Sequence, residues 1–274
     1  MTTSPAFNLG ARSIVTLHDL NFASRPEWYS PRFRAVYRVT ALPGLRSADI
    51  VVAVSDHVRE EALRCLRLRP EHTYRVYNGT NELRSDPAPE PQKTGTQYIL
   101  SVGSLQPHKN LKRMVDAFLL VSEAYPGLEL WVVGRKQPRF RNNNEEENLL
   151  RHPKIRSLGY LPDAELYETY VNAVAFCYPS IEEGFGLPIL EAMQAGVPVV
   201  TSNRSCLPEI AGGAAELADP FSVSSIANAL KKVLSLSPSE RDRVVSTGAA
   251  RAKQFSWHTS AEAYLQLYRK LLDV

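Results

Sequence analysis

The chain has 274 residues, of which 44% are hydrophobic and 22% charged, so it is long enough for one large or two modest domains. This composition excludes a mini-protein, a multi-module array and a globally disordered chain. The net charge of +3 arises in residues 1–80, where 11 Lys and Arg accompany 7 Asp and Glu, and the lack of a basic stripe interleaved with aromatic residues disfavours nucleic-acid binding.

The first 80 residues alternate short β-branched runs with segments of helical period, which is the pattern of parallel α/β units. Strands are predicted at SIVTLHDL, DIVVAVS and TYRVYNGT, and helices over about 32–46 and 57–68. Three strands and two helices are fewer than a domain of roughly 100–150 residues usually has. This block therefore predicts an incomplete domain.

The composition changes at SDPAPEPQKTGT (85–96), which holds three prolines and no apolar residue larger than Ala and therefore predicts a linker. The alternation then restarts with strands at QYILSVG, LELWVVG, KIRSLGY, AVAFCYPS and PVVTS. Helices are expected over about 109–125, 145–152 and 163–172, from Leu187 onward, and in the C-terminal region. This second block has the element count of a complete doubly wound domain.

The sequence predicts a cytoplasmic protein. No apolar run approaches the roughly 18 residues of a spanning helix, and the first residues lack the layout of a secretory signal. The cysteines are expected to be small buried residues, because their odd number and spacing suit neither disulfides nor a zinc site: Cys65, Cys177 and Cys206. Four arginines expected on one helix favour either a solvated face or contact with an anionic substrate or the inner membrane face: Arg59, Arg64, Arg67 and Arg69.

The segment YPSIEEGFGLPILEAMQAGVPVVTS (178–202) is the most informative one. A strand is expected to end at Pro179, a turn with two glycines follows, and a helix opens with Pro188 at its first position, where the missing N–H costs nothing. Gly184 and Gly186 remove side chains where a ligand would approach the backbone, and the positive end of the helix favours a phosphate. The pattern indicates a site for a nucleotide diphosphate.

Two carboxylates accompany this turn. Glu183 lies in the turn and Glu191 eight residues later in the helix, so both can line one ligand from different sides. Taken alone, Glu183 is equally typical of a helix-capping acid and Glu191 of a solvated helix residue. The glycines between them favour the ligand site.

Two further candidates lie where strands are expected to end. In VGSLQPHKN (102–110), Lys109 stands at a helix start, where its ammonium and the backbone amides would hold a phosphate at the carboxyl edge of the sheet. The alternative is a merely exposed lysine. His18 ends the strand SIVTL and is either a structural histidine or a group that reaches an interdomain cleft.

These motifs resemble those of the group 1 retaining glycosyltransferases, whose GT-B architecture has two facing Rossmann-like domains. HDL, AVSD, YNGT, VGSLQPHKNL and EGFGLPILEAM occur in the family's order and approximate spacing over nearly all of the chain. The resemblance implies an α/β, GT-B-like fold with a complete C-terminal Rossmann-like domain and an incomplete N-terminal one, because the family's usual strands before HDL are missing. The domains expected are a partial acceptor-side domain (1–84), a linker (85–96), a nucleotide-sugar-binding domain (97–256) and a C-terminal helix that crosses back to the first domain (257–274).

The resemblance also implies roles for single residues. Glu183 would contact the transferred sugar near its reacting face, His18 would contact it from the first domain, and Lys109 would neutralise the leaving diphosphate. Glu191 would bind the ribose. The other donor-binding residues implied are Gly103 and Ser104, Tyr160 and Leu161 near the base, and Gly184, Phe185, Gly186 and Leu187 along the sugar and diphosphate.

Ser104 departs from the family, in which an arginine often occupies its position. That diphosphate contact is therefore missing here or is made by another residue such as His108. No Asp-x-Asp motif occurs in the chain, and the family places fixed positive charge on the leaving group with side chains and helix dipoles, so neither a metal nor a cofactor is expected.

The function predicted is metal-independent, retaining transfer of a hexose from a nucleoside-diphosphate sugar to a polysaccharide or lipid-linked acceptor. The VGSLQPHKNL variant is similar to that of mannosyl- and rhamnosyl-type members. The alternative is a non-catalytic or partner-completed subunit that binds a sugar nucleotide, which the incomplete first domain motivates. An NAD-dependent dehydrogenase is disfavoured, because neither VGSLQP nor VGRKQP has the G-x-G-x-x-G fingerprint.

An incomplete first domain would leave a strand unpaired at the edge of its sheet. The apolar residues Ile14, Val15 and Leu17 lie on or next to that edge. Because an unpaired apolar edge is a pairing surface, we expect self-association or recruitment of a partner chain through residues 12–20.

Overall fold

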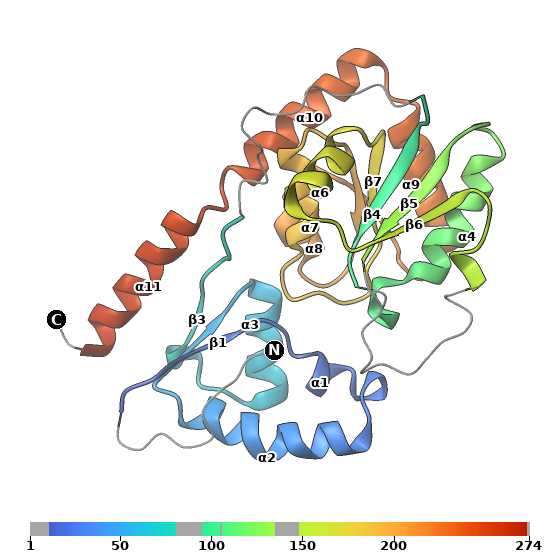
Figure 1. Ribbon diagram of the computed structural model, residues 1–274. Coiled ribbons are helices and arrows are strands. Elements are labelled where there is room, and N and C mark those ends of the chain that lie inside the picture. Colours follow the sequence, from blue (N-terminus) through green and yellow to red (C-terminus); the bar gives the residue numbers. More distant parts are fainter. Residues whose placement is uncertain (1–10, 81–94, 105, 135–147, 273–274) are drawn as a thin grey trace. The chain divides into compact units, whose positions relative to one another are not determined.

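The computed structural model describes residues 11–80, 95–104, 106–134 and 148–272. The chain divides into two compact units, and each is described by itself (Figure 1). Unit 1 comprises residues 1–79, 183–185 and 255–274, and unit 2 comprises residues 80–182 and 186–254. The linker predicted at 85–96 lies largely outside the described residues, and the helix predicted near 145–152 lies partly outside them. The domain limits predicted from the sequence stay a prediction.

Unit 1 is built on a three-stranded parallel sheet in the order β1-β2-β3 (Ile14–Leu17, Ile50–Ala53 and Thr73–Arg75). The predicted strands are confirmed, although each is shorter than the apolar run that signalled it. The central strand β2 is buried along its whole length, as a strand covered on both faces should be. The helices and 3-10 turns of this unit are α1 (Asn21–Ser24), η1 (Pro26–Trp28), α2 (Pro31–Ser47), α3 (Asp56–Leu66), η2 (Pro70–His72) and α11 (Trp257–Leu272).

Helix α11, from the C-terminal part of the chain, packs against the sheet of unit 1. Leu267 is buried in one cluster with Ile50, Val52 and Val76. Ser260 Oγ donates a hydrogen bond of 2.6 Å to the carbonyl oxygen of Tyr77. Burying a leucine side chain stabilises a fold by about 1.5–3 kcal/mol, so α11 is an integral part of this unit.

Unit 2 contains a six-stranded parallel sheet in the order β6-β5-β4-β7-β8-β9. Counted along the chain within this unit, the order is third, second, first, fourth, fifth, sixth, which is that of the doubly wound nucleotide-binding fold. The prediction of an α/β doubly wound domain is thereby confirmed. The strands are β4 (Tyr98–Val102), β5 (Glu129–Val133), β6 (Ile155–Gly159), β7 (Ala175–Tyr178), β8 (Val199–Ser202) and β9 (Glu216–Ala218).

Helices cover both faces of this sheet (Figure 1). Helices α4 (Leu111–Ser122) and α9 (Val223–Leu234) pack together on one face, over a core that includes Ile99, Phe118 and Leu230. The other face carries α6 (Asp163–Val171), α7 (Leu187–Gln194), α8 (Leu207–Ala211) and α10 (Pro238–Ala252). Strand β9 was not predicted, because Glu-Leu-Ala contains no β-branched or aromatic residue.

The four-arginine helix was predicted wrongly. Helix α3 ends at Leu66, because Arg67 takes a left-handed conformation (φ 52°) and Pro70 follows shortly after. Arg67 and Arg69 therefore lie beyond the helix. Arg59 uses its Nε to donate to the carbonyl of Thr73 at 2.8 Å, which is a structural contact.

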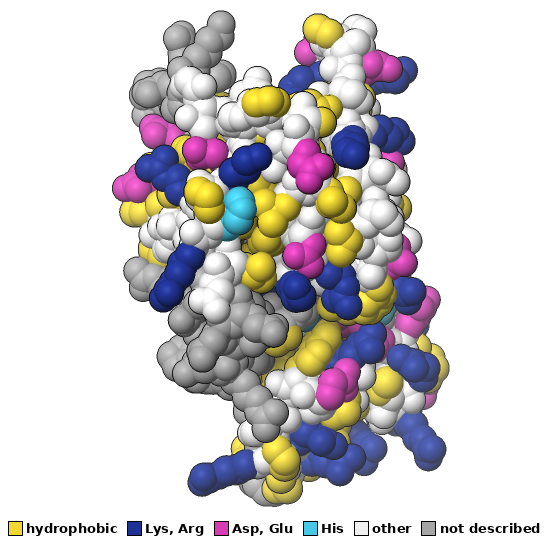
Figure 2. All heavy atoms as spheres, turned by 90° about the vertical axis from the view of Figure 1, so that its right-hand side faces the viewer, with side chains coloured by type: hydrophobic (Ala, Val, Ile, Leu, Met, Phe, Trp, Pro, Cys, Tyr) yellow, Lys and Arg dark blue, Asp and Glu magenta, His cyan; other side chains and the backbone are white. Residues whose placement is uncertain are grey.

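The burial of the cysteines agrees only in part with the prediction. Cys177 and Cys206 are buried as predicted, whereas Cys65 is exposed, because it lies on the solvent side of α3. Among the helices that the structure describes, none combines the length and the apolar character that crossing a bilayer requires. Lys and Arg side chains are numerous over the surface shown in Figure 2.

Three glycines end three neighbouring strands of unit 2: Gly103 after β4, Gly134 after β5 and Gly159 in β6. Gly103 N donates to Val133 O at 2.9 Å and Gly134 N to Gly159 O at 2.7 Å, so the sheet ladder continues past the strand ends. A Cβ on Gly134 would overlap the carbonyl oxygen of Gly103. Close backbone contact at this edge thus requires glycine.

Gly134→Ala tests this requirement. The variant should lose about 2–5 kcal/mol of unfolding free energy, because it combines an unfavourable positive φ with a clash against backbone that cannot move freely. Gly127→Ala is the matched control: Gly127 also has a positive φ, but no atom of the described residues lies within 4 Å of the position that a Cβ would take there. The control should lose only about 1–2 kcal/mol in chemical denaturation. Equal losses in the two variants would contradict the close-contact explanation.

Candidate functional site

The sheet of unit 2 reverses its strand order between β4 and β7. Open α/β sheets bind ligands outside the carboxyl ends of their strands at such a switch point. A small pocket lies there, lined by the end of β4, the loop after it, the start of α4 and the last residue of β7. The predicted residues Gly103, Ser104 and Lys109 all line this pocket, so the structure brings them together.

Lys109 ends η3 (Pro107–Lys109), a 3-10 turn that leads into α4. Its Nζ donates a hydrogen bond of 2.5 Å to the hydroxyl of Tyr178 and lies 4.9 Å from the centroid of that ring. The aliphatic stem passes Gly103, whose Cβ position would be 3.6 Å from Lys109 Cε. The phenol hydroxyl is a hydrogen-bond partner that orients the ammonium at the edge of the pocket.

Tyr178 is a site residue that the sequence analysis missed. It is the last residue of β7, on the opposite side of the switch point from the Lys109 loop. The sequence does place Tyr178 at the end of a buried strand, directly before Pro179, and this position was the one feature that could have indicated it. Without the strand order, nothing in the sequence pairs it with a lysine 69 residues away.

Helix α7 begins at Leu187 with Gly186 at its N-cap in the left-handed region (φ 96°). No side chain caps this end, so the backbone N–H groups of the first turn are not satisfied by a capping side chain. Such an end favours an anion. Pro188 is the second residue of the helix, one position later than predicted.

Glu191, further along α7, is half-buried, and its Oε2 accepts a hydrogen bond of 2.9 Å from the hydroxyl of Tyr170. Burial raises the pKa of Glu191, the hydrogen bond from Tyr170 opposes that shift, and the charge of Asp163 adds to it. Tyr170 itself is fully buried. The alternative of Glu191 as a solvated helix residue is therefore wrong, because its carboxylate is held in a partly desolvated position.

The turn residues Glu183, Gly184 and Phe185 belong to unit 1. The carbonyl oxygen of Gly184 accepts a hydrogen bond of 2.8 Å from Ser55 Oγ, and a Cβ on Gly184 would overlap the carbonyl oxygen of His18. The structure thus brings His18 and Gly184 together. The ring of Phe185 is buried, 6.0 Å from that of Tyr77 and 5.7 Å from that of Phe255.

A Cβ would meet backbone at the first glycine of the turn and a movable side chain at the second, whose backbone also has a positive φ of 96°. At Gly184 the obstacle is the backbone of His18, and at Gly186 it is the Cδ2 atom of Leu207, 2.7 Å away. Packing against the His18 backbone accounts for glycine at 184, and the positive φ accounts for glycine at 186; that these residues also make room for a ligand stays a prediction. The backbone contacts of Gly184, Phe185, Gly186 and Leu187 with a donor stay a prediction.

His18 follows β1 directly, and its side chain is exposed. Burial of the remaining part of the imidazole lowers the pKa of His18, and the neighbouring Asp19 carboxylate opposes this shift. A neutral imidazole at neutral pH can both donate and accept a hydrogen bond.

The other predicted residues of unit 2 do not line the pocket beside Lys109: His108, Tyr160, Leu161, Gly186, Leu187 and Glu191. Tyr160 follows β6 directly and is 62% exposed, and Leu161 is half-buried. His108 is buried, and its carbonyl oxygen accepts from Ile181 N at 2.8 Å. The roles implied for these residues by the resemblance stay predictions.

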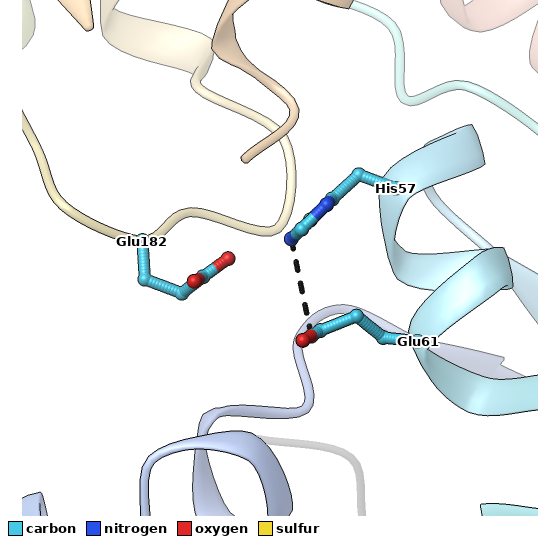
Figure 3. A group of neighbouring side chains, drawn as sticks. All are labelled: His57, Glu61 and Glu182. Carbon is cyan, nitrogen blue, oxygen red and sulfur yellow. Dashed lines mark ion pairs between the residues drawn. The ribbon is translucent and has the colours of Figure 1, made fainter. Parts of the chain in front are cut away.

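One titratable pair on α3 was not predicted. His57 Nε2 lies 3.9 Å from Glu61 Oε2, one helical turn away, as Figure 3 shows. Glu61 also accepts from Arg64 at 3.4 Å. Both residues of the His57–Glu61 pair belong to unit 1, and the contacts are those of a helix-stabilising network.

Comparison with known proteins gives matches over both parts of the chain. The family described as "Glycosyl transferases group 1" matches residues 84–251, and the family described as "Glycosyltransferase Family 4" matches residues 2–83. The chain is 35% identical over 276 residues to O-antigen chain mannosyltransferase B of Escherichia coli, covering 95% of this chain and 71% of that relative.

Another relative is the serotype-specific mannosyltransferase WbdA of Escherichia coli, which is 25% identical over 98% of this chain. The chain spans only 35% of WbdA. Among solved structures, Anabaena Alr3699/HepE in complex with UDP-glucose superposes with a TM-score of 0.76 at 21% identity, over 96% of this chain and 72% of that one. At this identity the likeness shows the fold alone.

The titration of Glu191 makes the free energy of unfolding depend on pH, and the direction of its pKa shift fixes the sign of that dependence. Its pKa is raised above the ordinary value of 4.5, so the folded state binds this proton more tightly than the unfolded state does. The free energy of unfolding should therefore fall as pH rises from 4.5 through the raised pKa. Glu191→Gln removes this titration and should become more stable relative to the wild type as pH rises.

Chemical denaturation of the wild type and Glu191→Gln between about pH 3 and 7.5 measures the effect. Glu240→Gln is a control in which the pH dependence of stability should have the opposite sign, because hydrogen bonds from Ser237 lower the pKa of Glu240. Relative to this control variant, the wild type should lose stability as pH falls. A wild-type minus Glu191→Gln difference that is constant with pH would contradict the burial of the carboxylate.

Proposed function

Because the chain belongs to the group 1 glycosyltransferase family, we propose that it transfers a mannose-type hexose from a nucleoside-diphosphate sugar to a glycan acceptor, with retention and without a metal. The fold is GT-B-like, with parallel Rossmann-like sheets. Mannosyl transfer is supported by the 35% identity to an O-antigen chain mannosyltransferase. A polysaccharide or a lipid-linked glycan is the proposed acceptor.

The single observation that carries the proposal is the fixed ammonium of Lys109 at the switch point between β4 and β7. In the proposed reaction, the bond between the anomeric carbon and the diphosphate oxygen breaks, the acceptor hydroxyl oxygen forms the new glycosidic bond on the same face, and the hydroxyl proton passes to an oxygen of the departing diphosphate. Negative charge grows on the departing diphosphate. A positive group that is already in place stabilises this charge without reorganisation in the transition state.

Two features of α7 support the same donor. The N-terminal turn at Gly186 and Leu187 presents backbone N–H groups and a positive dipole, which suit the diphosphate. Glu191 would accept hydrogen bonds from the ribose hydroxyls of the nucleotide. Its contact with Tyr170 holds the carboxylate in one orientation, which reduces the entropy lost on binding.

The remaining roles are proposed from the resemblance. Glu183 and His18 would contact the transferred sugar, and both belong to unit 1, where Gly184 packs on His18. Gly103 and Ser104 would contact the diphosphate beside Lys109. Tyr160 and Leu161 would lie near the base.

A nucleoside diphosphate without metal should raise the melting temperature of the protein. Ligand at about 100 times its Kd stabilises the folded state by about 2.7 kcal/mol. GDP and UDP are each titrated in the presence of EDTA and followed by thermal unfolding. Lys109→Ala should lose most of the shift, whereas the control Lys112→Ala should keep it, because Lys112 is an exposed residue that pairs with Asp116. Unchanged melting of the wild type with both nucleotides at millimolar concentration would refute the donor site.

The two carboxylates should separate binding from turnover. Glu191→Ala should weaken nucleoside diphosphate binding by about 1–3 kcal/mol, because the ribose hydroxyls lose a charged partner. Glu183→Ala should keep that affinity and lose sugar transfer or sugar-nucleotide hydrolysis. Calorimetry and a product assay measure the two effects. Equal weakening of nucleotide binding by both changes would overturn this assignment, and wild-type binding without turnover would favour a sugar-nucleotide-binding subunit.

A further inference from the structure

The side chain of Asn110 is buried beside the candidate site and does not perform the usual task of its position. Asn110 is the N-cap residue of α4, and an asparagine there ordinarily accepts a hydrogen bond from the first turn. In this protein its side chain makes no such bond. The residue is 4% exposed and takes a left-handed backbone conformation (φ 62°).

The amide of Asn110 instead connects separate loops. Its Nδ2 donates to the carbonyl oxygen of Pro179 at 3.0 Å and to that of Pro220 at 2.6 Å. Its Oδ1 accepts from an NH group of Arg113 at 3.1 Å. Both hydrogens of the NH₂ group are thereby used, and the Arg113 contact on Oδ1 fixes which way the amide points.

The connected loops all leave the carboxyl edge of the same sheet. Asn110 lies in the loop after β4, Pro179 directly follows β7, and Pro220 follows β9. A second bond, from Ile181 N to the carbonyl oxygen of His108 at 2.8 Å, joins the first two loops again. Polar contacts therefore tie these loops together at the switch point.

The bonds form two consecutive pairs. Lys109 contacts Tyr178 through its ammonium, and the next residue, Asn110, contacts Pro179, the residue after Tyr178, through its amide. Fixing the second pair fixes the backbone that carries both members of the first. We propose that Asn110 is a positioning residue, which acts on the donor diphosphate only through the placement of Lys109; this rests on the function proposed above.

The variants must separate the effect of losing the Asn110 amide from the effect of straining its left-handed backbone conformation. Asn110→Gly keeps the positive φ without strain and removes the amide, and glycine is tolerated at an N-cap. Asn110→Asp keeps the shape but replaces the two N–H donors with a carboxylate that faces two carbonyl oxygens. Asn172→Gly is the control for loss of an asparagine amide at a helix boundary away from the pocket: Asn172 is the C-cap of α6, and its Nδ2 donates to the backbone carbonyl of Glu168 at 2.8 Å.

The test is a double-mutant cycle on binding of GDP and UDP by calorimetry, with folding checked by circular dichroism and melting. Lys109→Ala should lower the affinity for whichever of the two nucleotides binds by about 10–100-fold, the range of a charge-assisted contact. Asn110→Gly should weaken it by at least about 5-fold, and Asn110→Asp by as much or more. The control Asn172→Gly should leave affinity unchanged.

The decisive measurement is the double variant Lys109→Ala with Asn110→Gly. If Asn110 acts only through Lys109, the double variant should bind within about 2-fold of Lys109→Ala alone. If the double variant loses affinity by the product of the two single-variant factors, Asn110 has a general structural role and the proposal is overturned. Unchanged affinity in both folded Asn110 variants would also overturn it. Should Asn110→Gly unfold, the same comparison is made with Asn110→Asp. If Lys109→Ala itself binds normally, the proposed function fails first, and the Asn110 proposal fails with it.

Discussion

The candidate site of unit 2 depends on the reversal of strand order between β4 and β7. Parallel strands send their connections out at the same edge, and at a reversal the two neighbouring connections turn to opposite faces of the sheet. The loop that carries Lys109 and the loop that leads to α7 leave from these two strands. Their separation creates the pocket, and the contact between Lys109 and Tyr178 crosses it.

The elements could be predicted from the sequence because hydrophobic period and turn residues are local properties. Lys109 and Glu191 could be proposed as site residues because each lies within a motif beside a helix start; their roles stay predictions. Their partners could not, because Tyr178 and Tyr170 become neighbours only through the strand order and the packing of α6 on α7. Strand β9 was missed since its three residues have no β propensity, and α3 was extended too far because one residue in a left-handed conformation ended it.

The glycines of the turn have a structural explanation that the sequence alone does not show. A glycine beside an expected ligand site is easily attributed to the ligand. At Gly184, however, the carbonyl oxygen of His18 occupies the space of a Cβ, and at Gly186 the backbone has a positive φ of 96°. A residue far away in the sequence imposes the requirement at Gly184, so it is visible only in the fold. Substitution would therefore disturb packing at Gly184 and strain the backbone at Gly186, whether or not a ligand is bound.

The assembly of unit 1 from distant segments constrains how the protein folds while it is being made. Its three strands are translated early, but Leu267 and the rest of α11, which cover their sheet, leave the ribosome only after all of unit 2. The apolar residues Ile50 and Val52 therefore lack this cover throughout synthesis of the intervening segment of about 175 residues, which includes a complete sheet of its own. Unit 2 can bury its core first, whereas the sheet of unit 1 gains this cover only once α11 has been synthesised.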